Sequence, residues 1–262
     1  MDFASFYNKQ PDYIAFRDDP SRRKDYNVIS DWKVRKLVQL IPADFKAEIV
    51  LEVGCAFGVL LNNIADRLRL KARIGVDISS KNIEAAKKLF PDCIFFQGTF
   101  EEFISAQSVE IKDSRFDLIV LSDIIEHLPD DLGFLKTVSN YSSFVLLNLP
   151  LEKSLSTRNR EYGEQDPSGH LRCYDEAIAI QLVTKAGFEI VKSFTATAFF
   201  DQQFLEVYKK NRKSRVQRKP VPQRVFWSLF YPLQDMLKSV SRSVTDKIYG
   251  TNYFALLKST RS

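Results

Sequence analysis

The chain has 262 residues, of which 45% are hydrophobic and 27% are charged, and its formal net charge is +5. This length and composition predict one large α/β domain with a modest extension, because a chain of this size can bury a full core. The three cysteines show no CxxC spacing, which argues against a disulfide framework and favours a reducing compartment.

No targeting or membrane-spanning segment is expected. The first residues lack a basic end followed by an apolar stretch, so they do not resemble a secretory signal. The longest apolar run near the end, residues 225–233, has nine residues including a proline and is too short to span a bilayer. We therefore expect a cytoplasmic protein, with peripheral contact to a membrane surface as an open alternative.

The positive charge is concentrated in one segment. Eight Lys or Arg residues and no acid lie between Lys209 and Arg224, and without these eight cations the net charge of +5 becomes −3. The main body is therefore mildly acidic, and one short segment carries the basic character.

In chain order, the apolar patterns alternate between helices and strands. Residues 1–46 are polar, with one predicted helix over 30–40, and a buried strand follows at 48–53. Further helices are predicted after Gly58, from a cap at Ser80, near 132–138, and from a cap at Asp175. The other predicted strands cover residues 72–78, 93–96, 116–121, 143–147, 188–194 and 252–257.

This alternation predicts an α/β fold, namely an open, seven-stranded, mostly parallel, doubly wound sheet. Ligands bind such sheets beyond the carboxyl ends of the strands, at the point where the strand order reverses. The residues that directly follow the first four strands are therefore the candidates for a binding site.

The first strand ends in an acid and a glycine turn. Glu52 lies in an otherwise apolar strand, and a carboxylate in such a setting is expected to have a partner. Gly54 and Gly58 allow the backbone to turn sharply against a ligand, and the following helix directs free N–H groups at the same place. Neither the dinucleotide Gly-x-Gly-x-x-Gly pattern nor the phosphate-loop Gly-Lys-Ser/Thr is present, so an acid before the glycines favours a cationic or amino-bearing ligand.

The second acid of the pattern is Asp77, which lies 23 residues beyond Gly54 at the end of the second strand. An acid at this position is placed to accept hydrogen bonds from ribose hydroxyls. Thr99 and Phe100 follow the third strand, and Ser122 follows the fourth.

With these residues, the sequence resembles the class I S-adenosylmethionine-dependent methyltransferases of the small-molecule or glycan type, over residues 47–196 and the last strand. Glu52, Gly54 and Gly58 match the family's acid and Gly-x-Gly-x-Gly motif, while Ala56 replaces the middle glycine. The segments 116–119 (FDLI), 126–129 (EHLP) and 170–174 (HLRCY) are also similar to this subgroup. The resemblance implies S-adenosylmethionine as cofactor and these cofactor-binding residues: Glu52, Gly54, Cys55, Ala56, Gly58, Asp77, Ile78, Thr99, Phe100 and Ser122.

Such an enzyme acts mainly by holding the methyl donor and the acceptor in line, because the methyl group of the cofactor is already activated. A base is needed only where the acceptor must lose a proton. The chain has two histidines, His127 after the fourth strand and His170 in the polar loop 152–170. We predict that one of them is the base, with His170 favoured, against the alternative that both make structural hydrogen bonds.

A metal-binding pattern is only partly matched. Asp123, Glu126 and His127 have the i, i+3, i+4 spacing of one helical face, and ubiquinone-biosynthesis O-methyltransferases have a similar acid-x-x-Glu-His cluster that implies a divalent metal. Because the first member here is Asp, a capping and hydrogen-bonding role is favoured and no metal is predicted. In the loop 152–170, Arg158 and Arg160 are expected either to grip an anionic acceptor or to remain solvated.

The basic, aromatic segment forms an insertion before the last strand, where the resembled family has a short connection. Three interpretations are open for residues 209–231: peripheral contact with an anionic membrane, nucleic-acid binding, or a solvated basic loop followed by a packed amphipathic helix. Nucleic acid is disfavoured, because the Asn/Asp-Pro-Pro-aromatic motif of base-amine methyltransferases is absent after the fourth strand.

The sequence therefore predicts methyl transfer from S-adenosylmethionine to a hydroxyl or amine of a small molecule or glycan, including an envelope or lipid-linked sugar. The alternatives are a non-catalytic cofactor-binding regulator, an RNA methyltransferase that uses the basic insertion, and a nicotinamide dehydrogenase. The oligomeric state is not predicted. The expected organisation is an N-terminal helical segment over residues 1–46 that caps the acceptor side, a cofactor-binding core over 47–200, a basic, amphipathic insertion over 201–247 and the last strand over 248–262.

Overall fold

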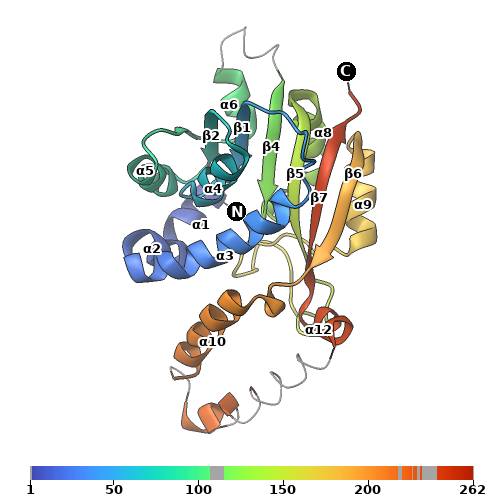
Figure 1. Ribbon diagram of the computed structural model, residues 1–262. Coiled ribbons are helices and arrows are strands. Elements are labelled where there is room, and N and C mark those ends of the chain that lie inside the picture. Colours follow the sequence, from blue (N-terminus) through green and yellow to red (C-terminus); the bar gives the residue numbers. More distant parts are fainter. Residues whose placement is uncertain are drawn as a thin grey trace.

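The structure of the protein is a computed structural model that describes residues 2–106, 115–217, 220–225, 227–228, 231 and 241–261 (Figure 1). It contains a seven-stranded sheet in the order β3-β2-β1-β4-β5-β7-β6. All neighbouring strands pair in parallel except β7, which is antiparallel to both β5 and β6. The predicted α/β fold with a mostly parallel doubly wound sheet is therefore confirmed.

Each of the seven predicted strands is present, and each prediction overlaps the strand observed. The predictions for β5, β6 and β7 ended before the observed strands do, most clearly at β5, where Asn148 and Pro150 interrupt the apolar run. The strands are β1 (Ile49–Val53), β2 (Ala72–Asp77), β3 (Ile94–Gln97), β4 (Phe116–Ser122), β5 (Ser142–Leu151), β6 (Phe188–Ala196) and β7 (Thr251–Ser259).

Two layers of helices cover the sheet. The buried residues form two clusters, one beneath α6, α8 and α9 and the other beneath α3, α4 and α5, so each face of the sheet has its own apolar core. These helices are α3 (Pro20–Val38), α4 (Val59–Leu68), α5 (Ser80–Leu89), α6 (Phe100–Ala106), α8 (Asp131–Tyr141) and α9 (Glu176–Lys185).

Helix starts follow side-chain caps, as the sequence suggested, with one correction. Asp175 caps α9 by accepting from the N–H of Ile178, as predicted. The cap of α5 is Ser79 rather than Ser80, and its hydroxyl accepts from the N–H of Asn82. Ser79 is extended and Ser80 is already helical, so the hydroxyl one residue earlier is the one that reaches the free N–H groups.

The N-terminal segment is more helical than predicted. Instead of one helix over 30–40, it forms α1 (Phe3–Lys9), α2 (Pro11–Asp18) and α3, which begins at Pro20 after an Asp19 cap. The start of α3 carries mostly polar residues, so apolar periodicity revealed only its second half. Figure 1 shows α3 crossing the face of the sheet.

Trp32 anchors α3 to the sheet. Its side chain is 3% exposed, and its ring centroid lies 5.5 Å from that of Phe254 on β7 and 6.2 Å from that of Phe204 on α10. The second half of α3 therefore belongs to the same apolar core as the central strands, whereas α1 has no buried residue.

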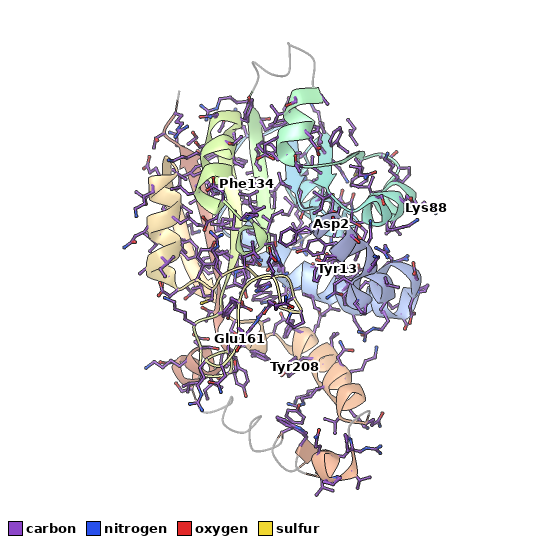
Figure 2. All side chains as sticks on the ribbon, turned by 180° about the vertical axis from the view of Figure 1, so that it is seen from behind. Asp2, Tyr13, Lys88, Phe134, Glu161 and Tyr208 are labelled. Carbon is purple, nitrogen blue, oxygen red and sulfur yellow. The ribbon has the colours of Figure 1, made fainter. Side chains whose placement is uncertain are left out.

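The basic segment begins as α10 (Gln202–Gln217), in a lobe that projects from the body; Figures 1 and 2 show this helix, with Tyr208 on it. Lys210 Nζ lies 3.1 Å from the buried Asp25 of α3, and Arg35 Nη2 lies 2.5 Å from Asp201, so α10 is fastened to α3 by ion pairs. Lys209 and Lys213 are exposed.

Several of the predicted basic and aromatic residues lie outside the described part of the chain, among them 218–219, 226 and 229–230. After the segment come α12 (Arg242–Tyr249) and β7. Within the described residues, no helix has the length and apolar character needed to span a bilayer. The contact of residues 209–231 with an anionic membrane stays a prediction.

If α3 is part of the core, replacing Trp32 by Ala removes a large buried ring from between the sheet and α10. We expect the Trp32→Ala variant to lose about 3–5 kcal/mol of unfolding free energy, as large aromatic truncations in cores do. Leu155→Ala is the matched control, because Leu155 is 60% exposed, and it should change stability by less than about 0.5 kcal/mol. Urea denaturation followed by circular dichroism measures both, and equal midpoints for the two variants would contradict the packing of α3.

Candidate active site

Two cavities lie side by side beyond the carboxyl ends of β1, β2 and β4, where the strand order reverses between β1 and β4. Their volumes are about 650 and 350 Å³. Five residues line both cavities, namely Tyr7, Tyr13, Gly54, Asp123 and His127. The two cavities are therefore adjacent compartments of one site, placed where this class of sheet binds ligands.

The glycine turn after β1 is tied to β2 by its backbone. The N–H of Gly54 donates to the carbonyl of Val76 at 2.8 Å, and the N–H of Ala56 donates to Asp77 Oδ2 at 2.9 Å. Gly54 has a φ of +75°, and a Cβ added there would lie 2.6 Å from Cδ1 of Ile124. The turn therefore needs glycine at position 54 for its conformation and for the close approach of the next segment.

Gly58 is the one residue of the predicted cofactor set that lines neither of these two cavities. Gly58 caps α4 with a φ of +78°, and a Cβ there would meet the ring of Phe95 at 2.7 Å, so its role is to start the helix. Cys55 belongs to the apolar core between the sheet and α4 and also lines the smaller cavity. The remaining cofactor predictions all line one cavity or the other.

Asp77 lines the larger cavity at the end of β2. It is 9% exposed, and its Oδ1 accepts from the N–H of Ser79 at 2.8 Å. Burial raises the pKa of Asp77 to about 6. Ile78, Thr99 and Phe100 line the same cavity, so the structure brings together the residues predicted to meet a ribose and an adenine.

Glu52 borders the smaller cavity on the face of the sheet covered by α3 and α4. Alternate residues of a strand point to opposite faces, so Glu52 shares its face with Val50, which packs in the α3–α4 core. Its side chain is buried, its Oε2 has no hydrogen-bond partner among the described residues, and burial raises its pKa to about 8. The partner that the sequence led us to expect is not supplied by the described protein atoms at this oxygen.

Lys33 is a site residue that sequence reasoning missed. It projects from α3 into the smaller cavity and forms an ion pair with Asp123, whose carboxylate also accepts from Ser122 Oγ and Asn148 Nδ2. The packing of α3 against the sheet brings this cation into the same cavity as Glu52. No motif in the sequence around Lys33 indicates this position.

Both histidines line the smaller cavity, so the structure brings the two candidate bases together. Their ring centroids are 4.7 Å apart. His127 Nδ1 lies 2.9 Å from the carbonyl oxygen of Gly169, and His170 Nδ1 lies 2.7 Å from Glu152 Oε2. Burial lowers the pKa of His127 to about 4, so this ring is neutral at pH 7.

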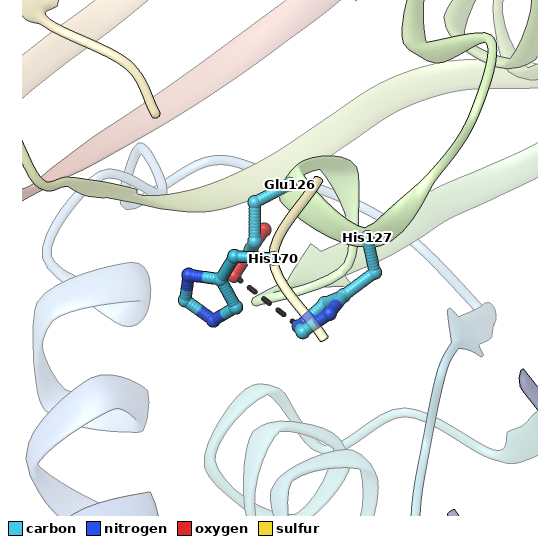
Figure 3. A group of neighbouring side chains, drawn as sticks. All are labelled: Glu126, His127 and His170. Atoms are coloured by element: carbon cyan, nitrogen blue, oxygen red, sulfur yellow. Dashed lines mark ion pairs between the residues drawn. The ribbon is translucent and has the colours of Figure 1, made fainter. Parts of the chain in front are cut away.

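Glu126 lies beside the two rings on the 3-10 turn η1 (Ile125–His127), as Figure 3 shows. It is 1% exposed, and neither carboxyl oxygen has a hydrogen-bond partner in the described structure. His127 Nε2 lies 3.7 Å from Oε1 of this carboxyl group. Burial raises the pKa of Glu126 well above its usual range.

The loop 152–170 is held by an internal ion-pair network. Arg160 lies 2.6 Å from both Glu152 Oε1 and Asp166 Oδ2, and Asp166 also accepts from the N–H of Ser168. The expectation that Arg160 either grips an acceptor or remains solvated is therefore wrong, because two carboxylates of its own loop already bind its guanidinium. Arg158 is exposed.

The N-terminal helices close the site from the other side. Tyr7 of α1 makes an edge contact with the His127 ring at 5.8 Å between centroids, and Tyr13 of α2 contacts Tyr7 at 5.6 Å. Asn8 of α1 accepts a hydrogen bond from the hydroxyl of Ser79, two residues after Asp77. Sequence analysis missed these wall residues, because α1 and α2 showed no apolar periodicity.

A family model for the methyltransferase domain matches residues 22–193, well over half of the chain. The chain belongs to the class I S-adenosylmethionine-dependent methyltransferases. This methyltransferase is 30% identical over 93 residues to a curated ubiquinone biosynthesis O-methyltransferase of Actinobacillus pleuropneumoniae serotype 5b (strain L20), in a match that covers 34% of the chain and 38% of that protein. The matched part thus spans well under half the length of that relative.

Solved structures share the fold of this methyltransferase. The magnesium protoporphyrin IX methyltransferase of Synechocystis PCC 6803, with bound SAH, has a TM-score of 0.57 at 14% identity, with 98% of each chain covered. A plantazolicin methyltransferase in complex with SAH has a TM-score of 0.53 at 16% identity, with 98% of this chain and 97% of that chain covered. At these identities the likeness concerns the fold alone.

The burial of Glu52 makes the stability of this methyltransferase depend on pH. Because the folded pKa of about 8 exceeds the usual value, the folded protein holds this proton longer than the unfolded chain. The stabilising contribution is therefore fully present below the unfolded pKa and is lost as the pH rises through about 8. A tenfold difference in proton affinity between the folded and unfolded states corresponds to about 1.4 kcal/mol, so the loss is on the order of a few kcal/mol.

We expect Glu52→Gln to lose less unfolding free energy than the wild-type protein between pH 5 and pH 8.5, since the amide has no proton to lose. The matched control is Glu48→Gln, because the Glu48 side chain is 74% exposed and its replacement should leave the wild-type pH dependence unchanged. Urea melts across this pH range measure the three slopes. A Glu52→Gln slope equal to that of the wild type would show that Glu52 is not the titrating group.

Proposed function

We propose that this protein transfers the methyl group of S-adenosylmethionine to a hydroxyl or amine of a small molecule or glycan. The observation that carries the proposal is the pair of adjoining compartments at the switch point of the sheet. Asp77 lines the larger compartment, and Glu52, Lys33 and His170 line the smaller one. Gly54 of the turn and His127 border both.

The chemistry of the larger compartment suits an adenosine group. Asp77 offers a buried carboxylate to ribose hydroxyls, and Ile78 and Phe100 offer apolar surface to a base. Thr99 is the only one of the predicted adenine contacts with a polar side chain, and its hydroxyl already caps the start of α6 through the N–H of Glu102.

The charges beside the shared turn suit a methionine group. Lys33 offers a cation to a carboxylate, and Glu52 offers an acid to an ammonium or sulfonium. A cationic ligand beside Glu52 would favour its ionised form, because the attraction between the charges would offset the desolvation penalty that raises the pKa of this acid. S-adenosylmethionine supplies an activated methyl group when bound, and these residues hold and orient it.

The smaller compartment provides the acceptor side. The two histidines line this compartment, and each Nδ1 is bound to a neighbouring oxygen. When Nδ1 carries the proton, Nε2 has the lone pair that remains available to a ligand. These lone pairs activate an acceptor hydroxyl either by taking its proton or through a cation that they bind. The names of the relatives, an O-methyltransferase of ubiquinone biosynthesis and methyltransferases of a porphyrin and of plantazolicin, support a small-molecule acceptor.

The cofactor part of the proposal is tested by calorimetry with S-adenosylhomocysteine. Asp77→Asn should weaken binding about 10- to 100-fold, because a hydrogen bond to a charged group contributes about 1.5–3 kcal/mol. Asp92→Asn, at an exposed position in the next turn of the chain, is the matched control and should bind like the wild type. If NAD binds and S-adenosylhomocysteine does not, the proposed function is wrong.

Turnover is tested by untargeted mass spectrometry for +14 Da products in extracts incubated with enzyme and cofactor. We expect His170→Gln to lower the rate at saturating cofactor by about 10²-fold or more, the scale of losing a positioned proton-transfer group. Affinity for S-adenosylhomocysteine should stay within about twofold of wild type, since His170 does not line the adenosine compartment and its ring is bound to Glu152. The histidine assignment fails if His170→Gln and His127→Gln both keep near-normal rates.

A further inference from the structure

We propose that Glu126, His127 and His170 bind one divalent transition-metal cation at the inner wall of the smaller cavity. The site lies in the compartment that the proposed function assigns to the acceptor, but its occupation can be measured without cofactor or acceptor. The two proposals can therefore fail separately.

The three side chains have the composition and spacing of a metal site. Each offers one ligand atom, and these atoms all lie within 4.8 Å of one another (Figure 3). Two imidazoles and one carboxylate are a ligand set typical of zinc, iron, cobalt or manganese. Ligands about 2.1 Å from a shared ion lie roughly 3–4 Å apart, so side-chain movements of about 1 Å would close this site.

The second coordination sphere is already built. A metal-binding histidine usually donates its other ring N–H to a carboxylate or a backbone carbonyl, which fixes the tautomer and the ring orientation. His170 Nδ1 faces Glu152 Oε2 at 2.7 Å, and His127 Nδ1 faces the carbonyl oxygen of Gly169 at 2.9 Å. Glu152 is itself held by Arg160. Both rings are thus oriented through Nδ1 and leave Nε2 as the nitrogen available to a metal.

The carboxyl group of Glu126 is an independent sign of a missing partner. It is 1% exposed, and neither oxygen has a hydrogen-bond partner among the described residues. A buried acid without a partner is costly, and a cation beside it would offset that cost. The only ion-pair contact found for it there is His127 Nε2 at 3.7 Å, which is the ring nitrogen that the metal would share.

This ligand set differs from the acid-x-x-Glu-His run of the sequence. Asp123 has a φ of +53° and points its carboxylate at Lys33, Ser122 and Asn148, and it is not among the clustered ligand atoms of the described chain. Its place is taken by His170, which the loop 152–170 brings back from 43 residues beyond His127. A bound cation would therefore join this loop to η1.

The test uses the full-length protein, stripped with a chelator and titrated with Co²⁺ alone. We expect one equivalent to bind, with visible absorption of nitrogen and oxygen coordination and without the intense thiolate band that binding at Cys173 or Cys93 would give. Glu126→Gln, His127→Gln and His170→Gln should each weaken Co²⁺ binding at least tenfold. Glu152→Gln should weaken it about 10- to 100-fold as an outer-sphere residue.

Asp123→Asn is the matched control, because it removes a neighbouring carboxylate outside the proposed ligand set and should leave Co²⁺ affinity within about threefold. The thermal midpoint and the far-ultraviolet circular dichroism spectrum, measured for every variant, establish that each one is folded. Absence of stoichiometric Co²⁺ binding, a thiolate spectrum, or a Co²⁺ affinity that depends on Asp123 and not on His170 would each overturn the proposal. A +14 Da product formed by protein that binds no Co²⁺ would leave the proposed function standing and the metal site refuted.

Discussion

The site depends on the hydrogen bonds that tie the turn after β1 to the end of β2. Gly54 and Cys55 both donate to the carbonyl of Val76, and Ala56 donates to the carboxylate of Asp77. These bonds hold two acids from different strands on either side of one glycine turn, although burial disfavours the charge of both. Packing of the sheet and its helices, which buries a full core on each face, holds the acids in place.

The sheet could be predicted from the sequence because each strand is a mostly apolar run that is recognisable by itself. Runs such as Ile49–Val53 and Phe116–Ser122 are apolar and bounded by helices or turns, so their place in an alternating pattern is read directly. The start of α3 and all of α1 and α2 were not predicted, because their stability comes from caps and from packing on other helices. Local propensity carries little information about such contacts.

The two halves of the site also differ in how far they can be predicted from the sequence. The residues on the cofactor side directly follow strands, so the topology of a parallel sheet brings them together and their spacing along the chain suffices to find them. Lys33, Glu152 and the meeting of Glu126 with His170 depend on a helix and a loop that fold back from distant positions. No spacing rule links these residues, and only the three-dimensional structure reveals that Arg160 is engaged within its own loop.

The short helix α1 borders both compartments of the site. Tyr7 borders each of them, Asn8 bonds to the segment that carries Asp77, and the helix itself has no buried side chain. Because no residue of this seven-residue helix is fully buried, moving it would cost less apolar contact than moving a core helix such as α4, which buries five residues. Movement of α1 would open both compartments at the same time. Access of the two proposed reactants to the site would therefore be coupled through one helix.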